Sequence, residues 1–131
     1  MLTKIHHVGI VVRSLDAAYA FYRDALCLPV HKEAVIQDQG VRAALLTIGE
    51  SEIELLEPIA PGTGVARFLE QRGEGLHHLC FETDDVNEEL ETAKRRGVGL
   101  IDQQPRAGLA GMICFLHPKS NHGVLIEYAQ P

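Results

Sequence analysis

The sequence lacks an excess of basic charge, any long apolar run and any paired cysteine motif. Its 12 lysines and arginines are outnumbered by 18 aspartates and glutamates, which gives a formal net charge of -6. This balance, with no block of lysine and arginine, argues against a nucleic-acid-binding surface. No apolar run approaches the roughly 18 residues that a membrane span needs, so we expect no membrane-spanning segment.

Cysteine is scarce as well, with only Cys27, Cys80 and Cys114. Their number is odd, they lie far apart, and no CxxC pair occurs, which argues against a disulfide framework or a cysteine-based zinc site. We expect three reduced thiols in the core of a cytoplasmic protein. The first expected strand begins within four residues of Met1, which leaves no room for a signal or transit peptide.

What the chain does have is an internal repeat. Its 131 residues, 46% hydrophobic and 23% charged, are typical of one globular domain over residues 1–131. Aligning His7 with His78, an offset of 71, pairs IHHVGIVV with LHHLCFET and SLDAAYAFYRDAL with DDVNEELETAKRRG. Each half is expected to be one βαβββ module, about 1–59 and about 75–131, joined by a linker helix at about 63–72. The predicted fold class is α+β, with curved mixed sheets.

The two long helices carry recognisable signals at their ends. Ser14 is a plausible cap for the first helix, and Asp85 followed by Glu88 resembles a capping box for the other, which Gly97 should stop. An apolar stripe marks the first helix at Leu15, Ala18, Tyr19 and Tyr22. Further strands are expected at residues 29–36, 41–49, 51–58, 98–104, 112–116 and 123–129.

Four polar residues recur at equivalent places on strands. His7 and His78 begin the first strand of each half, and Glu54 and Glu127 lie between apolar residues on the last. Strand alternation offers a plain alternative, in which each glutamate simply points to solvent. The recurrence favours a shared centre instead, because a carboxylate buried without a partner is costly. Two imidazoles and two carboxylates suit one divalent ion, with Co²⁺ first and Mn²⁺, Ni²⁺ or Zn²⁺ as alternatives.

Only one histidine of each His-His pair can face the shared centre, because adjacent residues of a strand point to opposite faces. Gly9 leaves space beside His7, whereas Val8, Ile10 and Val12 suit packing on a helix. Spacing alone leaves the choice open. We take His7 and His78 as the ligands, and His6 and His77 as supporting or packing residues.

These residues resemble a known family. The paired modules and the His/Glu quartet are similar to the vicinal-oxygen-chelate, or glyoxalase/bleomycin resistance, superfamily. Within it the chain most resembles the methylmalonyl-CoA epimerases, through IHHVGIVV, DQGVRAALL, IELLEP, VARFLEQRGEGLHHLCFETDD, RRGVGLID and FLHPKSNHGVLIE. The resemblance supports the metal ligands His7, Glu54, His78 and Glu127, and it implies a homodimer that binds an acyl-CoA thioester.

The resemblance also implies an activity, the interconversion of (R)- and (S)-methylmalonyl-CoA by α-proton abstraction through a metal-stabilised enolate. The chain departs from some epimerases, which have glutamate at the position of Ala43 and glutamine at that of Glu54. We therefore expect Glu54 to act as a base opposite Glu127. The departure at Met112 has no interpretation. Alternative functions are a lactoylglutathione lyase-type isomerase and a metal-free small-molecule binding or resistance protein.

Four other polar residues are weaker candidates for the functional site. His117 and His122 are interpreted as solvated loop residues. Lys119 and Arg106 are plausible partners for the substrate carboxylate or the CoA phosphates. No sequence pattern favours one of these two residues over the other.

Overall fold

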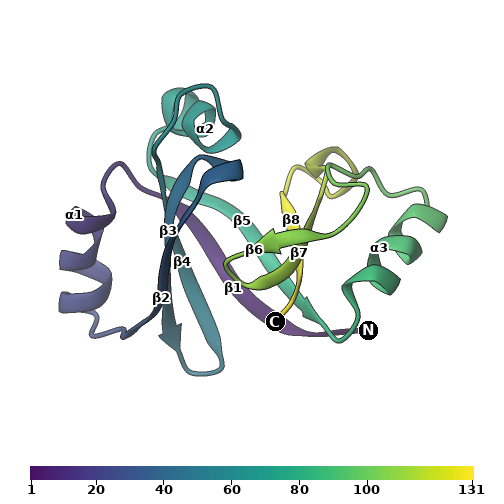
Figure 1. Ribbon diagram of the computed structural model, residues 1–131, viewed down its shortest axis with the longest axis horizontal. Helices are drawn as coiled ribbons and strands as arrows, with labels where there is room; N and C mark the ends of the chain where they lie inside the picture. The colour runs from purple at the N-terminus through teal and green to yellow at the C-terminus, as the bar shows by residue number, and fades with distance from the viewer. The chain divides into compact units, whose positions relative to one another are not determined.

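The computed structural model describes all 131 residues and contains eight strands and three α-helices. Figure 1 shows the elements in chain order, strand, helix and three strands, then a helix, and the same series again. This confirms the α+β class. The elements are β1 (Leu2–Val11), α1 (Leu15–Tyr19) continued by a π-helical segment (Ala20–Ala25), β2 (Val30–Ile36), β3 (Val41–Ile48), β4 (Ser51–Pro58), α2 (Gly64–Arg72), β5 (Gly75–Thr83), α3 (Val86–Arg95), β6 (Arg106–Gly108), β7 (Gly111–Leu116) and β8 (Ile126–Gln130).

The chain forms two compact units, one of residues 8–77 and one of residues 1–7 with 78–131. Strands β1 and β5 each contribute residues to both units. In the first unit β2, β3 and β4 form an antiparallel series. In the second, β5 pairs in parallel with β8, which pairs antiparallel with β7, and β7 with β6. The sheet is therefore mixed, as expected.

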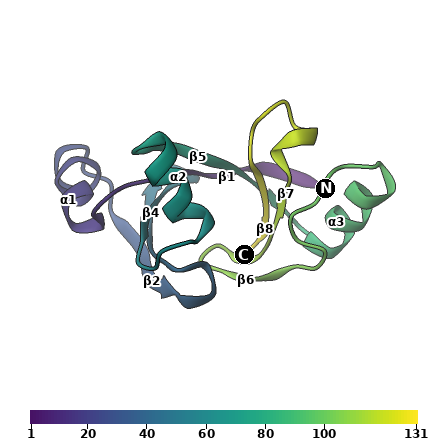
Figure 2. The ribbon, with the colours of Figure 1, turned by 90° about the horizontal axis from the view of Figure 1, so that it is seen from above.

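Helix α1 covers one face of the strands of its own unit (Figure 1, Figure 2). Ser14 is its cap, because the Ser14 hydroxyl accepts a hydrogen bond from the Ala17 N–H at 3.1 Å. The predicted apolar stripe faces inward: Leu15 and Tyr19 are buried with Val12, Ala44, Leu46 and Leu55, and Ala18 and Tyr22 pack against them. The stripe and the cap are both confirmed.

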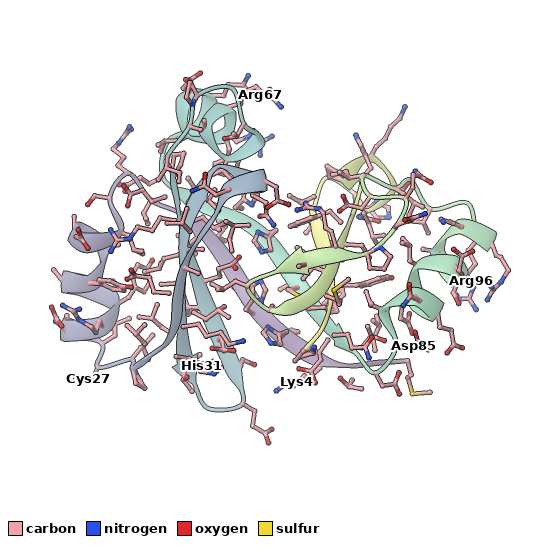
Figure 3. All side chains as sticks on the ribbon, in the orientation of Figure 1. Lys4, Cys27, His31, Arg67, Asp85 and Arg96 are labelled. Carbon is pink, nitrogen blue, oxygen red and sulfur yellow. The ribbon has the colours of Figure 1, made fainter.

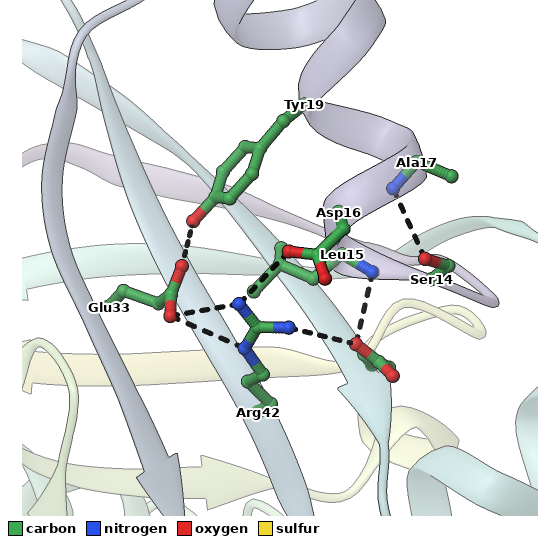
Figure 4. Close-up of polar contacts among 8 residues, drawn as sticks. Ser14, Leu15, Asp16, Ala17, Tyr19, Glu33 and Arg42 are labelled. Atoms are coloured by element: carbon green, nitrogen blue, oxygen red, sulfur yellow. Dashed lines mark hydrogen bonds and ion pairs between the residues drawn. The ribbon is translucent and has the colours of Figure 1, made fainter.

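Arg42 on β3 ties helix α1 to the strands beneath it (Figure 4). Its guanidinium lies 3.1 Å from Asp16 of the helix, 3.1 Å from Glu33 of β2 and 3.8 Å from Glu57 of β4. Glu33 also accepts a hydrogen bond from the Tyr19 hydroxyl. Burial of Tyr19 and its contact with Glu33 raise the pKa of the phenol, so Tyr19 stays protonated and donates.

Helix α3 packs in the same way on β7 and β8 of the other unit. Its buried side is formed by Val86, Leu90 and Ala93, against Cys114, Leu116 and Ile126. The Asp85 carboxylate accepts from the Glu88 N–H at 3.0 Å, so Asp85 is the cap. Gly97 has φ +75°, a left-handed conformation that ends the helix cheaply only at glycine. Asp85 as the cap and Gly97 as the stop are confirmed, whereas the capping box is not formed, because the Asp85 N–H donates to the Thr83 hydroxyl at 3.1 Å and not to Glu88.

The strand expected at 98–104 is wrong. Only Leu100 makes a bridge, to Leu116, and the edge strand β6 forms later, at Arg106–Gly108. Asp102 explains the difference, because its carboxylate accepts from the Phe115 N–H at 2.8 Å, where a strand carbonyl would otherwise bind. It also holds Arg106 at 3.0 Å. Backbone hydrogen bonds still join the segment to β7, as from the Ile101 N–H to the Phe115 carbonyl at 3.0 Å, but the Asp102 side chain takes the Phe115 N–H and interrupts the ladder there.

The expectation that all three cysteines lie in the core is confirmed for two of them. Cys80 and Cys114 are buried, but Cys27 is exposed. Cys27 follows the end of the first helix in a left-handed conformation, φ +61°, and its side chain lies outside the core (Figure 3). All three are free thiols, as expected. None of the helices has the length and hydrophobicity needed to cross a lipid bilayer.

Candidate metal centre

Three of the four expected ligands meet within one compact unit. The Nε2 atoms of His7 and His78 are 3.0 Å apart. The Oε1 atom of Glu127 lies 2.9 Å from His7 Nε2 and 3.1 Å from His78 Nε2. Three donor atoms of two residue types therefore converge on one point.

The strand pairing explains why Glu127 reaches the histidines. Parallel pairing of β5 with β8 sets Glu127 opposite Cys80, two residues beyond His78. On its other side Glu127 lies opposite Phe115 of β7. The Phe115 ring contacts His78 edge-on, with centroids 5.5 Å apart. The imidazole of His78 is thus fixed by packing as well as by its neighbours in the centre.

Strand alternation places these polar groups on the face that α3 does not cover. Ile126 and Tyr128, which flank Glu127, both belong to the apolar cluster under α3. Glu127 therefore points to the opposite side, yet it is only 3% exposed, against 0% for His7 and 5% for His78. The alternative in which Glu127 simply faces solvent is wrong.

The geometry of the three donors fits an ion. Ligand atoms about 2.1 Å from an ion and at right angles are about 3.0 Å apart, whereas tetrahedral ligands at that distance are about 3.4 Å apart. The observed separations of 2.9, 3.0 and 3.1 Å match one triangular face of an octahedron. Glu127 Oε1 is also a buried oxygen without a hydrogen bond of acceptable geometry, and a bound cation would satisfy it.

Glu127 is held as a carboxylate. Burial by itself would raise its pKa, but the contacts with His7 and His78 outweigh burial and lower it. An ionised carboxylate beside two imidazoles is a donor set for a divalent cation.

Glu54 belongs to the other compact unit, on β4. Its neighbours Ile53 and Leu55 pack in the cluster under α1, so Glu54 points to the opposite face, as Glu127 does in its own half. Glu54 is 7% exposed, so here too the solvent-facing alternative is wrong. Its partner in the β3 ladder is Leu45, and Ala43 lies on the same face two pairs further along.

One residue near His7, Cys80, was not singled out for the centre from sequence. Cys80 is completely buried, and His6, His7 and Cys80 form a second group of side chains with metal-ligating atoms close together. Burial raises the pKa of the Cys80 thiol to about 12, which keeps it protonated and unreactive. The signal for Cys80 was available, because a residue two positions after His78 shares its face of the strand.

The four weaker candidates are not part of the proposed metal centre. His117 and His122 are exposed, in line with the solvated loop interpretation. His117 Nδ1 accepts from the Lys119 N–H at 3.0 Å, which shapes the turn before β8. Arg106 is paired with Asp102 and lies over the Phe115 ring, 5.7 Å from its centroid.

Comparison with known proteins agrees with the fold. Residues 6–115 match the Glyoxalase/Bleomycin resistance protein/Dioxygenase superfamily. The chain belongs to this superfamily. Within it, the chain resembles methylmalonyl-CoA epimerases over almost its full length.

Three relatives document that resemblance. The ethylmalonyl-CoA/methylmalonyl-CoA epimerase of Cereibacter sphaeroides is 35% identical over 133 residues, 99% of each chain. A methylmalonyl-CoA epimerase in complex with methylmalonyl-CoA and ammonium is 40% identical, with a TM-score of 0.95 over 99% of this chain and 95% of that one. A variant of the Streptomyces coelicolor methylmalonyl-CoA epimerase in complex with 2-nitronate-propionyl-CoA is also 40% identical, with a TM-score of 0.95 over 99% of this chain and 98% of that one.

Proposed function

We propose that the protein is an isomerase that interconverts (R)- and (S)-methylmalonyl-CoA. One observation carries the proposal: His7, His78 and Glu127 converge in a chain 40% identical to an epimerase that binds methylmalonyl-CoA. The name of the Cereibacter relative adds ethylmalonyl-CoA as a second acyl-CoA substrate to be tested.

The ion would be held by His7, Glu54, His78 and Glu127, a group of four buried imidazole and carboxylate side chains that could hold a metal ion. Two nitrogen and two oxygen donors suit Co²⁺ first, with Mn²⁺, Ni²⁺ or Zn²⁺ as alternatives. These four residues would hold the ion, and substrate oxygens could complete its coordination. Glu54 is included because its place in the first half matches that of Glu127 in the second.

The reaction removes a proton from the carbon between the thioester and the carboxylate and returns it on the other face. A bound divalent ion supplies Lewis-acid stabilisation of the negative charge that develops on the thioester oxygen. Glu54 and Glu127 are the proposed bases, one from each half, because inversion needs a base on each side of the carbon.

The direct test uses one pure stereoisomer of methylmalonyl-CoA, in D₂O, with and without a chelator. We expect formation of the other stereoisomer, deuterium at the α-carbon, loss of both on chelation and recovery with Co²⁺. The hemithioacetal of methylglyoxal and glutathione, the substrate of a lactoylglutathione lyase, should not be turned over. Absence of α-carbon exchange on both methylmalonyl-CoA and ethylmalonyl-CoA would overturn the proposal.

The homodimer and the cytoplasmic location implied by the resemblance stay predictions. Sedimentation of the purified protein measures the first, and fractionation of the producing cell the second.

A further inference from the structure

We infer that His6 is a positioning residue, which holds His7 in the one tautomer that can bind the ion through Nε2. The inference rests on the metal site proposed above. Its basis is a contact of 2.7 Å between the Nδ1 atoms of His6 and His7, both buried on β1. The other nitrogen of His7, Nε2, faces His78 and Glu127.

The contact restricts the proton positions. A neutral imidazole has one N–H and one nitrogen lone pair, so of two Nδ1 atoms at 2.7 Å one donates and the other accepts. A metal-binding Nε2 must offer its lone pair, which places the proton of His7 on Nδ1. His6 Nδ1 is then the acceptor, and the proton of His6 lies on its own Nε2.

Because both rings are buried, loss of this hydrogen bond would cost free energy. His7 is fully buried and His6 is 7% exposed, so water is a poor substitute for His6 as a partner. A buried N–H that loses its acceptor costs about 1–3 kcal/mol. Outer hydrogen-bond partners of ligating histidines fix the ring and its tautomer, and their loss typically weakens metal binding about 10- to 100-fold.

The ring geometry supports orientation as well as tautomer choice. The two rings are nearly perpendicular, 82° apart, with centroids separated by 5.0 Å. Consecutive strand residues usually point to opposite faces, so a hydrogen-bonding contact between them is a specific feature of this strand. It sets the plane of His7, and hence the direction of the Nε2 lone pair.

The corresponding residue of the second half is used differently. His77 lies edge-on to Phe68 of α2, with centroids 5.0 Å apart and a 78° angle between the planes. We therefore assign the two His-His pairs different roles, with His6 acting on the ligand His7 and His77 packing on a helix. This asymmetry supplies a matched control.

The experiment compares Co²⁺ binding, followed by visible absorption, in the wild type and in His6→Leu, His6→Asn and His77→Leu. Leucine keeps the apolar volume but accepts no hydrogen bond, so His6→Leu should weaken Co²⁺ affinity about 10- to 100-fold. Asparagine can place an acceptor oxygen near the former Nδ1, so His6→Asn should stay within about threefold of the wild type. His77→Leu should also stay within about threefold.

A second readout needs no variant. In the Zn²⁺-loaded wild type, ¹⁵N NMR should show a protonated Nδ1 on His7 and an unprotonated Nδ1 on His6. The reverse arrangement overturns the inference, and so does Co²⁺ affinity in His6→Leu equal to that of the wild type. Equal loss in His6→Asn and His6→Leu overturns the acceptor role as well. If the wild type itself binds no ion, the proposed metal site fails and this inference with it. If the wild type binds Co²⁺ and His6→Leu binds it equally well, only the role of His6 fails.

Discussion

At the scale of single residues, the chain is unusual for the polar side chains that it buries on strands. His7, Glu54, His78 and Glu127 are each at most 7% exposed, and the two glutamates lie between apolar residues that pack under a helix. Burying carboxylates and imidazoles costs free energy unless they are paired or bind a cation. Their recurrence in both halves is therefore the strongest functional signal in the sequence.

Position 43 gives a test of which carboxylate moves the proton. Ala43 is buried on the same face of the β3–β4 ladder as Glu54, two pairs away along the strands. Glu54→Gln should lower kcat about 10²- to 10⁴-fold, the usual contribution of a general base, with the metal content unchanged. Adding Ala43→Glu to Glu54→Gln should restore much of the turnover, because it recreates the pattern of the epimerases with glutamate and glutamine at these positions.

Metal analysis and turnover of one stereoisomer check this prediction. Unchanged turnover in Glu54→Gln with normal metal content would rule Glu54 out as a base. Ala43→Glu alone is the matched control for the effect of a new buried carboxylate.

The three thiols should differ sharply in reactivity. Burial raises the pKa of Cys80 and of Cys114 to about 12 in each case. Cys27 is exposed. Because the thiolate is the reactive form, iodoacetamide at pH 8 should modify only Cys27 in the folded protein, and all three after denaturation. Peptide mass spectrometry reads the result, and rapid native modification of Cys80 would contradict the structure.

At the scale of elements, local sequence signals predicted the helix ends correctly but failed for the strand expected at 98–104. Ser14 and Asp85 accept the hydrogen bonds that caps should accept, and Gly97 ends α3. Each of these depends on two or three neighbouring residues, which the sequence displays. The strand expected at 98–104 is reduced to one bridge, Leu100 to Leu116, and the ladder is interrupted where Asp102 binds the Phe115 N–H, 13 residues away. A local pattern does not contain such a contact.

The cap of α3 should be measurable as stability. Asp85→Ala removes the acceptor for the Glu88 N–H and should cost about 1 kcal/mol. For a chain of this length that corresponds to roughly 4 °C in Tm. Asp85→Asn, which keeps an acceptor oxygen, should lose much less. Thermal unfolding followed by circular dichroism checks both variants, and an equal loss in the two would point to charge instead of capping.

At the scale of the whole molecule, the proposed ligands come from residues far apart in the chain. His7, His78 and Glu127 belong to the unit of residues 1–7 and 78–131, and Glu54 to the unit of residues 8–77. An ion held by all four would bind the folded chain and not the unfolded one. Ion binding should therefore stabilise the fold.

Thermal unfolding with and without Co²⁺ measures that stabilisation. At a free Co²⁺ concentration of 100 Kd the gain should be about 2.7 kcal/mol, or roughly 10 °C in Tm. Glu54→Leu, compared at the same Co²⁺ concentration, should lose most of the increment. An increment as large as that of the wild type in Glu54→Leu would exclude Glu54 from the ligand set.

The sequence by itself determined the repeat, the two capped helices and the identity of four recurrent polar residues, because these depend on neighbours in the chain or on comparison of its two halves. Only the tertiary structure decided that Cys27 lies outside the core, that residues 98–104 form no strand, and that His7, His78 and Glu127 have donor atoms 2.9–3.1 Å apart. Likewise, only packing distinguishes His6, which contacts His7, from His77, which packs on Phe68. Such distances arise from strand pairing between segments some 50 to 120 residues apart, and residue order alone does not specify them.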